Sequence, residues 1–196
     1  MPRSAAESAD LHRAARERAH RLAGGLSAQA LAWRPASGVW SIADGLEHLH
    51  RTAEGFLPEL DAAIARGHAK GRRGGVPARY GLAARKMIEG MEGTATALRT
   101  SASLDPARTP VASGGGATSG AASGVEGLAH LDADTQRYAA LCGRAEGLDL
   151  GRVKARYPFA PLLRLPLGAV LEITGLHALR HVGQMERVAE APGFPR

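Results

Sequence analysis

The chain has 196 residues, a formal net charge of +6 and only 4% aromatic residues. Its single cysteine excludes a disulfide framework, and no apolar run approaches the roughly 20 residues that a transmembrane helix needs. The basic residues are scattered along the chain, which argues against a nucleic-acid-binding protein. We therefore expect one helical domain, residues 1–196, that is soluble and cytoplasmic and has neither a membrane nor a nucleic acid as partner.

The first predicted helix covers residues 4–24 and ends at two consecutive glycines. Its apolar face is thin, so we expect it to cover a core rather than nucleate one. Such a face is also compatible with a homodimer interface. His12 and His20 lie on this helix, and the default expectation for both is a surface position.

A second helix is predicted over residues 42–66. Ser41 and Asp44 form a capping-box-like pair at its start, and Trp40 can pack against the helix entry. Apolar residues then recur with helical spacing. Pro58 is expected to kink or break this helix, because proline cannot donate a backbone hydrogen bond.

The middle of the chain has the weakest pattern. Residues 67–80 are interpreted as a basic, glycine-rich loop, and residues 81–100 as a helix weakened by two glycines. Residues 101–124 contain little that could be buried, so we expect a flexible low-complexity loop. Its glycines follow no strand and precede no Gly-Lys-Ser/Thr, so no nucleotide site is predicted there.

Two further helices are expected, at residues 125–146 and from Pro166 to about Glu190. A proline fits the first turn of a helix, because the backbone N–H that it lacks has no partner there. No stretch shows a convincing two-residue alternation of a strand. Four main helices with long connections predict an all-α fold, an antiparallel four-helix bundle.

The last predicted helix contains the stretch LHALRHVGQ, with His177 and His181 four residues apart. Residues at this spacing differ by about 40° around the helix axis, so both imidazoles share one face with Gln184. That face is otherwise apolar and therefore points into the bundle. Such a pair can chelate one metal ion, whereas two buried neutral histidines that are hydrogen-bonded to neighbours are the alternative.

A third ligand must come from another helix. His48 and His50 lie about 200° apart around the second helix, so both cannot face one site. Helical periodicity mildly favours His50, which lies nearer the apolar stripe. His130 is a further candidate on the third long helix, and Glu126 and Asp132 are nearby acids to which no specific signal points.

Both histidine-bearing segments resemble one known family. The segment WRPASGVWSIADGLEHL resembles the start of the second helix in the DinB-like superfamily, where a histidine follows Trp-Ser-Ile eight residues after the tryptophan. The segment LPLGAVLEITGLHALRHVGQMERV resembles the last helix of that superfamily, with its His-x3-His and following Gln. The two motifs occur in the right order and at the right distance.

The resemblance implies an up-down-down-up four-helix bundle and three histidines that hold a divalent metal, nickel or zinc. The first ligand then falls on His48, eight residues after Trp40, and the other two fall on His177 and His181. We follow the resemblance here, because a site at the rim of a bundle need not lie on the apolar stripe. His50 stays the alternative for the third ligand.

The resemblance also implies a class of chemistry, because some relatives are thiol-dependent S-transferases or isomerases. We expect a metal-dependent enzyme of that type, acting on a small molecule with a low-molecular-weight thiol as cofactor, and a hydrolase stays open. Arg180 and Arg187 could attract an anionic thiol. No catalytic residue is predicted beyond the metal ligands. The alternatives are a non-catalytic metal- or ligand-binding bundle and a stress-related, dimerising bundle.

Overall fold

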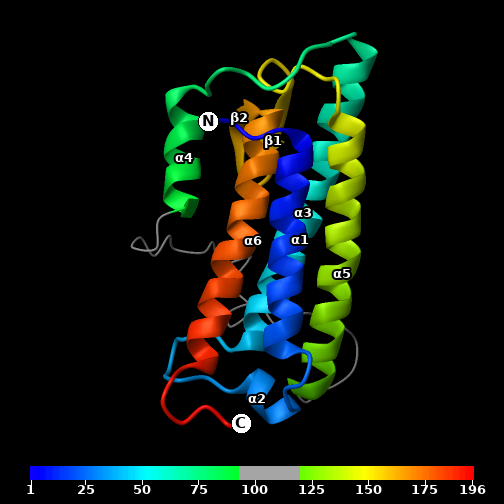
Figure 1. Cartoon of the computed structure of the whole chain (residues 1–196). Helices are drawn as coiled ribbons and strands as arrows, with labels where there is room; N and C mark the ends of the chain where they lie inside the picture. Colours follow the sequence, from blue (N-terminus) through cyan, green and yellow to red (C-terminus); the bar gives the residue numbers. More distant parts are fainter. Residues whose placement is uncertain (93–119) are drawn as a thin grey trace.

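The computed structural model describes residues 1–92 and 120–196 of the chain (Figure 1). These residues are mostly helical. Their helices are α1 (Ala5–Ala23), α2 (Ala28–Ala32), α3 (Ile42–Ala69), α4 (Leu82–Glu92), α5 (Gly120–Ala145) and α6 (Leu167–Ala189), and their strands are β1 (Lys154–Tyr157) and β2 (Ala160–Pro166). Two predictions fall partly outside the described residues. These are the predicted loop 101–124, of which 101–119 is not described, and the predicted helix 81–100, of which 93–100 is not described.

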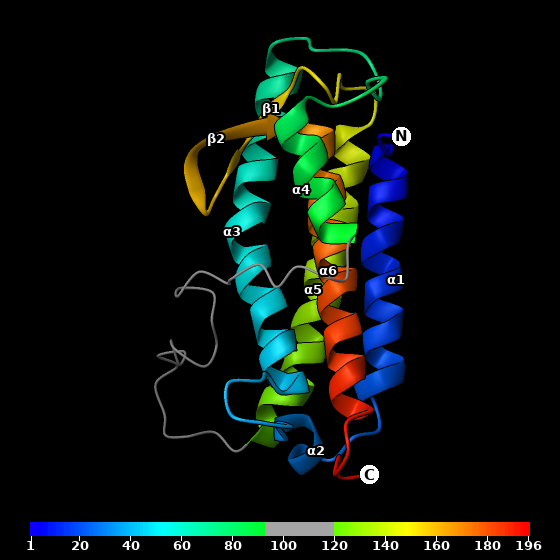
Figure 2. The same ribbon diagram turned by 90° about the vertical axis from the view of Figure 1, so that its left-hand side faces the viewer.

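Four long helices, α1, α3, α5 and α6, lie side by side (Figures 1 and 2). Helix α1 packs against α5 and α6, and α3 packs against the same two helices. The colours of Figure 1 show that α1 and α6 run in one direction, whereas α3 and α5 run in the other. This packing brings α3 and α6, which carry the predicted metal ligands, into direct contact. The short helix α4 covers part of α6.

Helix α3 begins at the predicted capping box. The Ser41 Oγ accepts a hydrogen bond from the backbone N–H of Asp44 at 3.1 Å, and the Asp44 carboxylate accepts one from the backbone N–H of Ser41 at 2.8 Å. The helix continues through Pro58 to Ala69, so a break at the proline was a wrong expectation. Buried apolar residues on both sides of Pro58, such as Leu60, hold the helix against its neighbours and offset the lost hydrogen bond.

A β-hairpin follows α5, although the sequence shows no convincing strand pattern there. Strands β1 and β2 pair antiparallel, with Ala155 opposite Leu165 and Arg156 opposite Arg164. Ala155 and Leu165 are buried and the two arginines are exposed, so each strand does alternate. The alternation covers too few residues to show in the sequence, and a bulge after Arg156 interrupts it.

His12 is buried inside the bundle, and its expected surface position is wrong. Its side chain stacks on Tyr138 with the ring centroids 3.9 Å apart, and its Nε2 lies 3.2 Å from the Thr174 Oγ1. That hydroxyl donates to the backbone carbonyl of Leu171, so it accepts from the His12 Nε2–H. Burial lowers the pKa of His12 to about 3, so the imidazole is neutral at neutral pH.

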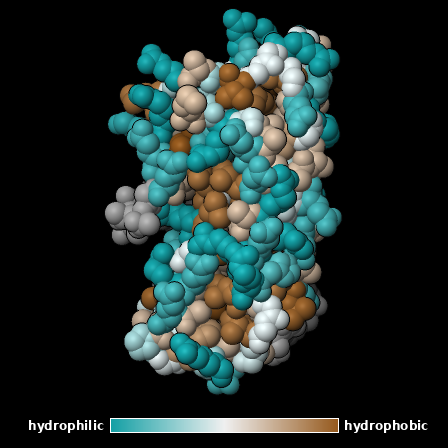
Figure 3. Space-filling model, viewed as in Figure 1, coloured by the Kyte–Doolittle hydropathy of each residue, from teal (hydrophilic) through white to brown (hydrophobic). Residues whose placement is uncertain are grey.

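The face of the molecule in Figure 3 is mostly polar, with apolar patches along its middle. Ion pairs also link the helices: Arg18 of α1 pairs with Glu186 of α6, and Arg137 of α5 pairs with Glu54 of α3. Exposed pairs of this kind contribute little to stability individually, at most about 1 kcal/mol each. Among the described residues, no helix combines the length and apolar character that crossing a membrane requires.

Candidate metal centre

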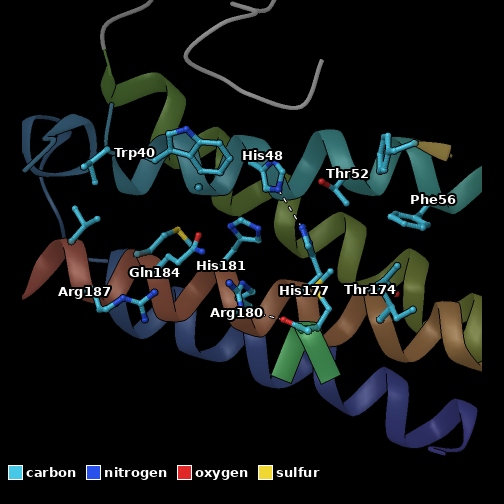
Figure 4. A pocket seen from close by; sticks show the side chains of 18 of the residues that line it. Trp40, His48, Thr52, Phe56, Thr174, His177, Arg180, His181, Gln184 and Arg187 are labelled. Carbon is cyan, nitrogen blue, oxygen red and sulfur yellow. Dashed lines mark hydrogen bonds between the residues drawn. The ribbon is translucent and has the colours of Figure 1, made fainter. Parts of the chain in front are cut away.

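Three imidazoles converge between α3 and α6, and we name His48, His177 and His181 the histidine triad (Figure 4). The ring centroid of His181 lies 4.4 Å from that of His48 and 4.4 Å from that of His177. The centroids of His48 and His177 lie 5.2 Å apart. One ring nitrogen from each residue lies within 4.8 Å of the other two. This spacing is compact enough for one ion to be reached by all three rings after small side-chain adjustments.

The two helices are close at this level for a specific steric reason. Gly45 lies one turn before His48, and a Cβ atom there would lie only 2.7 Å from the Met185 Cγ of α6. Trp40, just before the cap of α3, packs on His48 at 4.8 Å and on His181 at 5.9 Å between ring centroids. The tryptophan therefore walls one side of the triad and restricts the orientation of two of its rings.

The triad is desolvated, and this determines its charge. Burial is the largest cause that lowers the pKa of His177 to about 3, and His48 and Arg180 lower it further. Burial likewise lowers the pKa of His181 well below the ordinary value, while a hydrogen bond with Gln184 opposes the shift. His177 and His181 are therefore neutral at neutral pH, which is the form that binds a metal ion.

The donor set fits a divalent transition metal. The Nδ1 atom of His181 is buried and has no hydrogen-bond partner among the described residues. A buried polar atom without a partner costs about 1–3 kcal/mol, so such an atom indicates a ligand. Neutral imidazole nitrogens suit zinc and nickel rather than calcium or magnesium, which prefer oxygen ligands.

His50 faces the other side of α3, away from the triad. Its Nδ1 lies 2.8 Å from the Asp134 Oδ2 of α5, and its ring stacks on His130 at 4.0 Å. The structure thus brings His48 and not His50 together with the pair on α6, as the 200° separation on the helix requires. His50, Glu54 and Asp134 also form a close group, but Arg137 pairs with both of its carboxylates.

Asp132 and Glu126, the two acids near candidate ligands in the sequence, do not lie at the triad. Asp132 accepts hydrogen bonds from Arg16 at 2.6 Å and from His20 at 2.7 Å, on the α1 side of α5. These two partners lower the pKa of the Asp132 carboxyl against the opposing effect of its burial. Glu126 is exposed to solvent. Neither acid is among the described residues that line the cavity at the triad.

The triad opens into a cavity of about 1060 Å³. In Figure 4, Trp40, Gln184 and Arg187 lie on one side of the triad, and Thr52 and Phe56 lie on the other. Helix α4 and the hairpin complete the lining with Lys86, Met87, Met91, Tyr157 and Phe159. No local pattern in the sequence marks these five positions, and Thr52 could have been found only by its spacing of one helical turn from His48.

Comparison with known proteins points to one family. The sequence profile of the DinB superfamily matches residues 11–185. The matched range contains both histidine-bearing segments and every residue of the triad. No curated protein and no solved structure gives a significant match.

Proposed function

The chain belongs to the DinB superfamily, and from this premise we propose that it is a metal-dependent S-transferase that uses a low-molecular-weight thiol. In this proposal His48, His177 and His181 hold one divalent ion, zinc or nickel. The observation that carries it is the convergence of three imidazoles beside a large cavity. The directions of the four long helices support the up-down-down-up bundle that the family implies.

Three protein ligands leave coordination positions for other molecules, as in catalytic rather than structural zinc sites. A divalent ion held here supplies a positive charge that keeps a coordinated thiol deprotonated at neutral pH. The protein contributes the neutral donors, the Trp40 wall that orients them and the exclusion of water by burial. The side chains of Lys86, Arg180 and Arg187 also line the cavity, and their charge favours an anionic thiol.

The lining of the cavity favours thiol transfer over hydrolysis. Metal-dependent hydrolysis commonly uses a carboxylate that removes a proton from water. No aspartate or glutamate is among the described residues that line the cavity. A thiol would need no such base, because a divalent ion held by the triad would lower the pKa of a bound thiol below neutral pH. The same observation supports the second candidate, a non-catalytic protein that binds a metal-coordinating small molecule.

The size of the cavity is compatible with two bound molecules. This cavity measures about 1060 Å³, at the upper end of the range of about 300–1,000 Å³ for pockets of single drug-sized ligands. A transferase must hold the thiol and its acceptor together, whereas a simple binding protein needs room for one molecule. We therefore place both reactants in this cavity, with the thiol at the triad.

The proposal is tested with tag-free protein loaded with zinc or nickel. A chromogenic electrophile is offered with a panel of thiols, among them cysteine, glutathione, bacillithiol and mycothiol, and the conjugate is identified by mass. We expect turnover with one thiol and its loss in His48→Ala, while His50→Ala stays active. Metal binding without turnover would leave the non-catalytic candidate, and a chain that binds no metal would contradict both.

A further inference from the structure

We propose that the substrate of this chain carries a neutral apolar arm that ends in a ring, with a polar atom between the ring and the reacting group. The arm lies along α3, from the histidine triad past Thr52 to Phe56. The inference rests on the proposed function, because it places the reacting group at the triad. It names a substrate class for the part of the cavity that lies beyond the metal ligands. The family match does not state such a class.

The first observation is the hydroxyl of Thr52. This residue lies one turn after His48, lines the cavity and is only 5% exposed. Its Oγ1 is buried without a hydrogen-bond partner among the described residues, although a helical threonine commonly bonds to a carbonyl of the preceding turn. Figure 4 shows the side chain between His48 and Phe56. A hydroxyl both donates and accepts, so a polar ligand atom beside it removes the cost of the missing partner.

The second observation is an aromatic cluster, Phe56, Tyr157 and Phe159, that lines the cavity beyond Thr52. Tyr157 and Phe159 meet Phe56 edge to face, at 5.1 Å and 5.4 Å between ring centroids. The close approach of the hairpin depends on Gly55, where a Cβ atom would lie 2.8 Å from the Phe159 Cζ. Rings in this arrangement favour a further aromatic or flat apolar group.

The geometry of α3 sets the length of the arm. A helix rises about 1.5 Å per residue, so Thr52 lies about 6 Å and Phe56 about 12 Å beyond His48 along the axis. A ligand that binds at the triad therefore reaches the aromatic cluster only through an extended chain. The residues that α3 and the hairpin contribute beyond His48, namely Thr52, Phe56, Tyr157 and Phe159, are uncharged, so the arm is neutral.

The test uses the zinc-loaded full chain and three hydroxamates, which bind zinc through the same head group. Acetohydroxamate has no arm, 4-phenylbutanohydroxamate has an apolar arm with a terminal ring, and 2-(benzyloxy)acetohydroxamate has an ether oxygen in place of the middle methylene. Calorimetry gives the three dissociation constants without any need for turnover. We expect the phenylbutyl probe to bind roughly thirtyfold more tightly than acetohydroxamate, and the ether probe a further several-fold.

Variants assign the gains to named residues. Phe56→Ala should remove most of the gain from the ring, whereas Leu162→Ala, at a fully exposed hairpin position, should leave it unchanged. Thr52→Val keeps the shape of the side chain and should abolish the preference for the ether, and Thr52→Ser should retain it. Equal binding of all three probes would overturn the arm while leaving the metal site intact. A chain that takes up no zinc would remove the proposed function, and this inference with it.

Discussion

The Nε2 atoms of His48 and His177 lie 3.3 Å apart across the contact between α3 and α6, although 129 residues separate them in the chain. Two imidazole nitrogens at this distance hold one proton between them, donated by one ring and accepted by the other. A metal ion that bound both Nε2 atoms would take the place of that proton, which would move to the Nδ1 of the same neutral ring, so binding at neutral pH should release no proton. The pair is thus a preformed contact, which lowers the cost of bringing the ligands together.

The first prediction concerns metal content. Tag-free protein should bind about one zinc or nickel ion per chain, and His48→Ala should retain less than about a tenth of that, because two imidazoles on one helix form a weak chelate. Metal analysis after dialysis against a known free-metal concentration measures this directly. His50→Ala is the matched control, since His50 contacts Asp134 and His130 and should not affect the metal. Retention in His48→Ala with loss in His50→Ala would reverse the ligand assignment.

The second prediction concerns Trp40, whose ring packs on two members of the triad. Trp40→Ala should lower metal affinity roughly tenfold, because neighbours that orient ligating imidazoles typically contribute 10–100-fold. The tryptophan should also report occupancy, since a paramagnetic ion such as Cu²⁺ quenches a nearby indole. Trp33→Phe removes the other tryptophan, which contacts Phe194, and should leave the quenching intact. Quenching that disappears with Trp33 instead would place the ion elsewhere.

The third prediction concerns the dependence of stability on pH. His12 has a folded-state pKa of about 3 against an ordinary value of 6.5, so between these values the unfolded chain binds more protons. The neutral His12 imidazole therefore contributes its full stabilisation above pH 6.5, and this contribution is lost as the pH falls towards 3. Between pH 7 and pH 5 the loss should be about 2 kcal/mol in the free energy of unfolding.

Urea denaturation of the metal-free protein at the two pH values tests this prediction about His12. His12→Gln removes the titrating group, so its stability should fall less over the same interval, by about 2 kcal/mol. Every other titrating group is present in both proteins, so its contribution cancels in the difference. Parallel pH profiles would mean that the His12 imidazole is solvated and that its stacking on Tyr138 is transient.

The fourth prediction compares two helical glycines of opposite expected effect. A Cβ atom at Gly175 would lie 2.6 Å from the Leu11 Cβ and 3.2 Å from the backbone oxygen of Ser8, where α1 crosses α6. Gly175→Ala should therefore destabilise the fold by about 1–3 kcal/mol. Gly143 of α5 is exposed with nothing within 4 Å, so Gly143→Ala should stabilise by about 0.5–1 kcal/mol. A stable Gly175→Ala variant would show that α1 packs more loosely than described.

Local signals in the sequence predicted the long helices because those signals act within a few residues. The Ser41–Asp44 box and the apolar spacing after it place the start of α3, and Pro166 places the start of α6. The hairpin, the five-residue helix α2 and the burial of His12 depend on contacts between distant segments. Their physical causes, such as the Tyr138 ring over His12, leave no trace in the neighbouring sequence.

His48 rather than His50 converges with His177 and His181, which agrees with the motif and not with helical periodicity. A helical wheel ranks His48 and His50 by their distance from the apolar stripe, and it favours His50. Two other residues instead determine which face of α3 lies against α6 at the triad. Gly45 is small enough to allow the close approach of α6, and Trp40 packs on His48 from outside the helix. The resemblance of the Trp-Ser-Ile segment contained that information, because it relates the histidine to the tryptophan.

If the triad holds a metal ion as proposed, its location on two helices also links folding to metal supply. An ion held by α3 and α6 would be a cross-link between two histidines, His48 and His177, that lie 129 positions apart in the chain. Binding to the folded state alone adds about 2.7 kcal/mol at a free-metal concentration one hundred times the dissociation constant. Small domains are stable by only about 5–15 kcal/mol, so this is a large share. The lifetime of the chain against proteases should then rise and fall with the metal available to it.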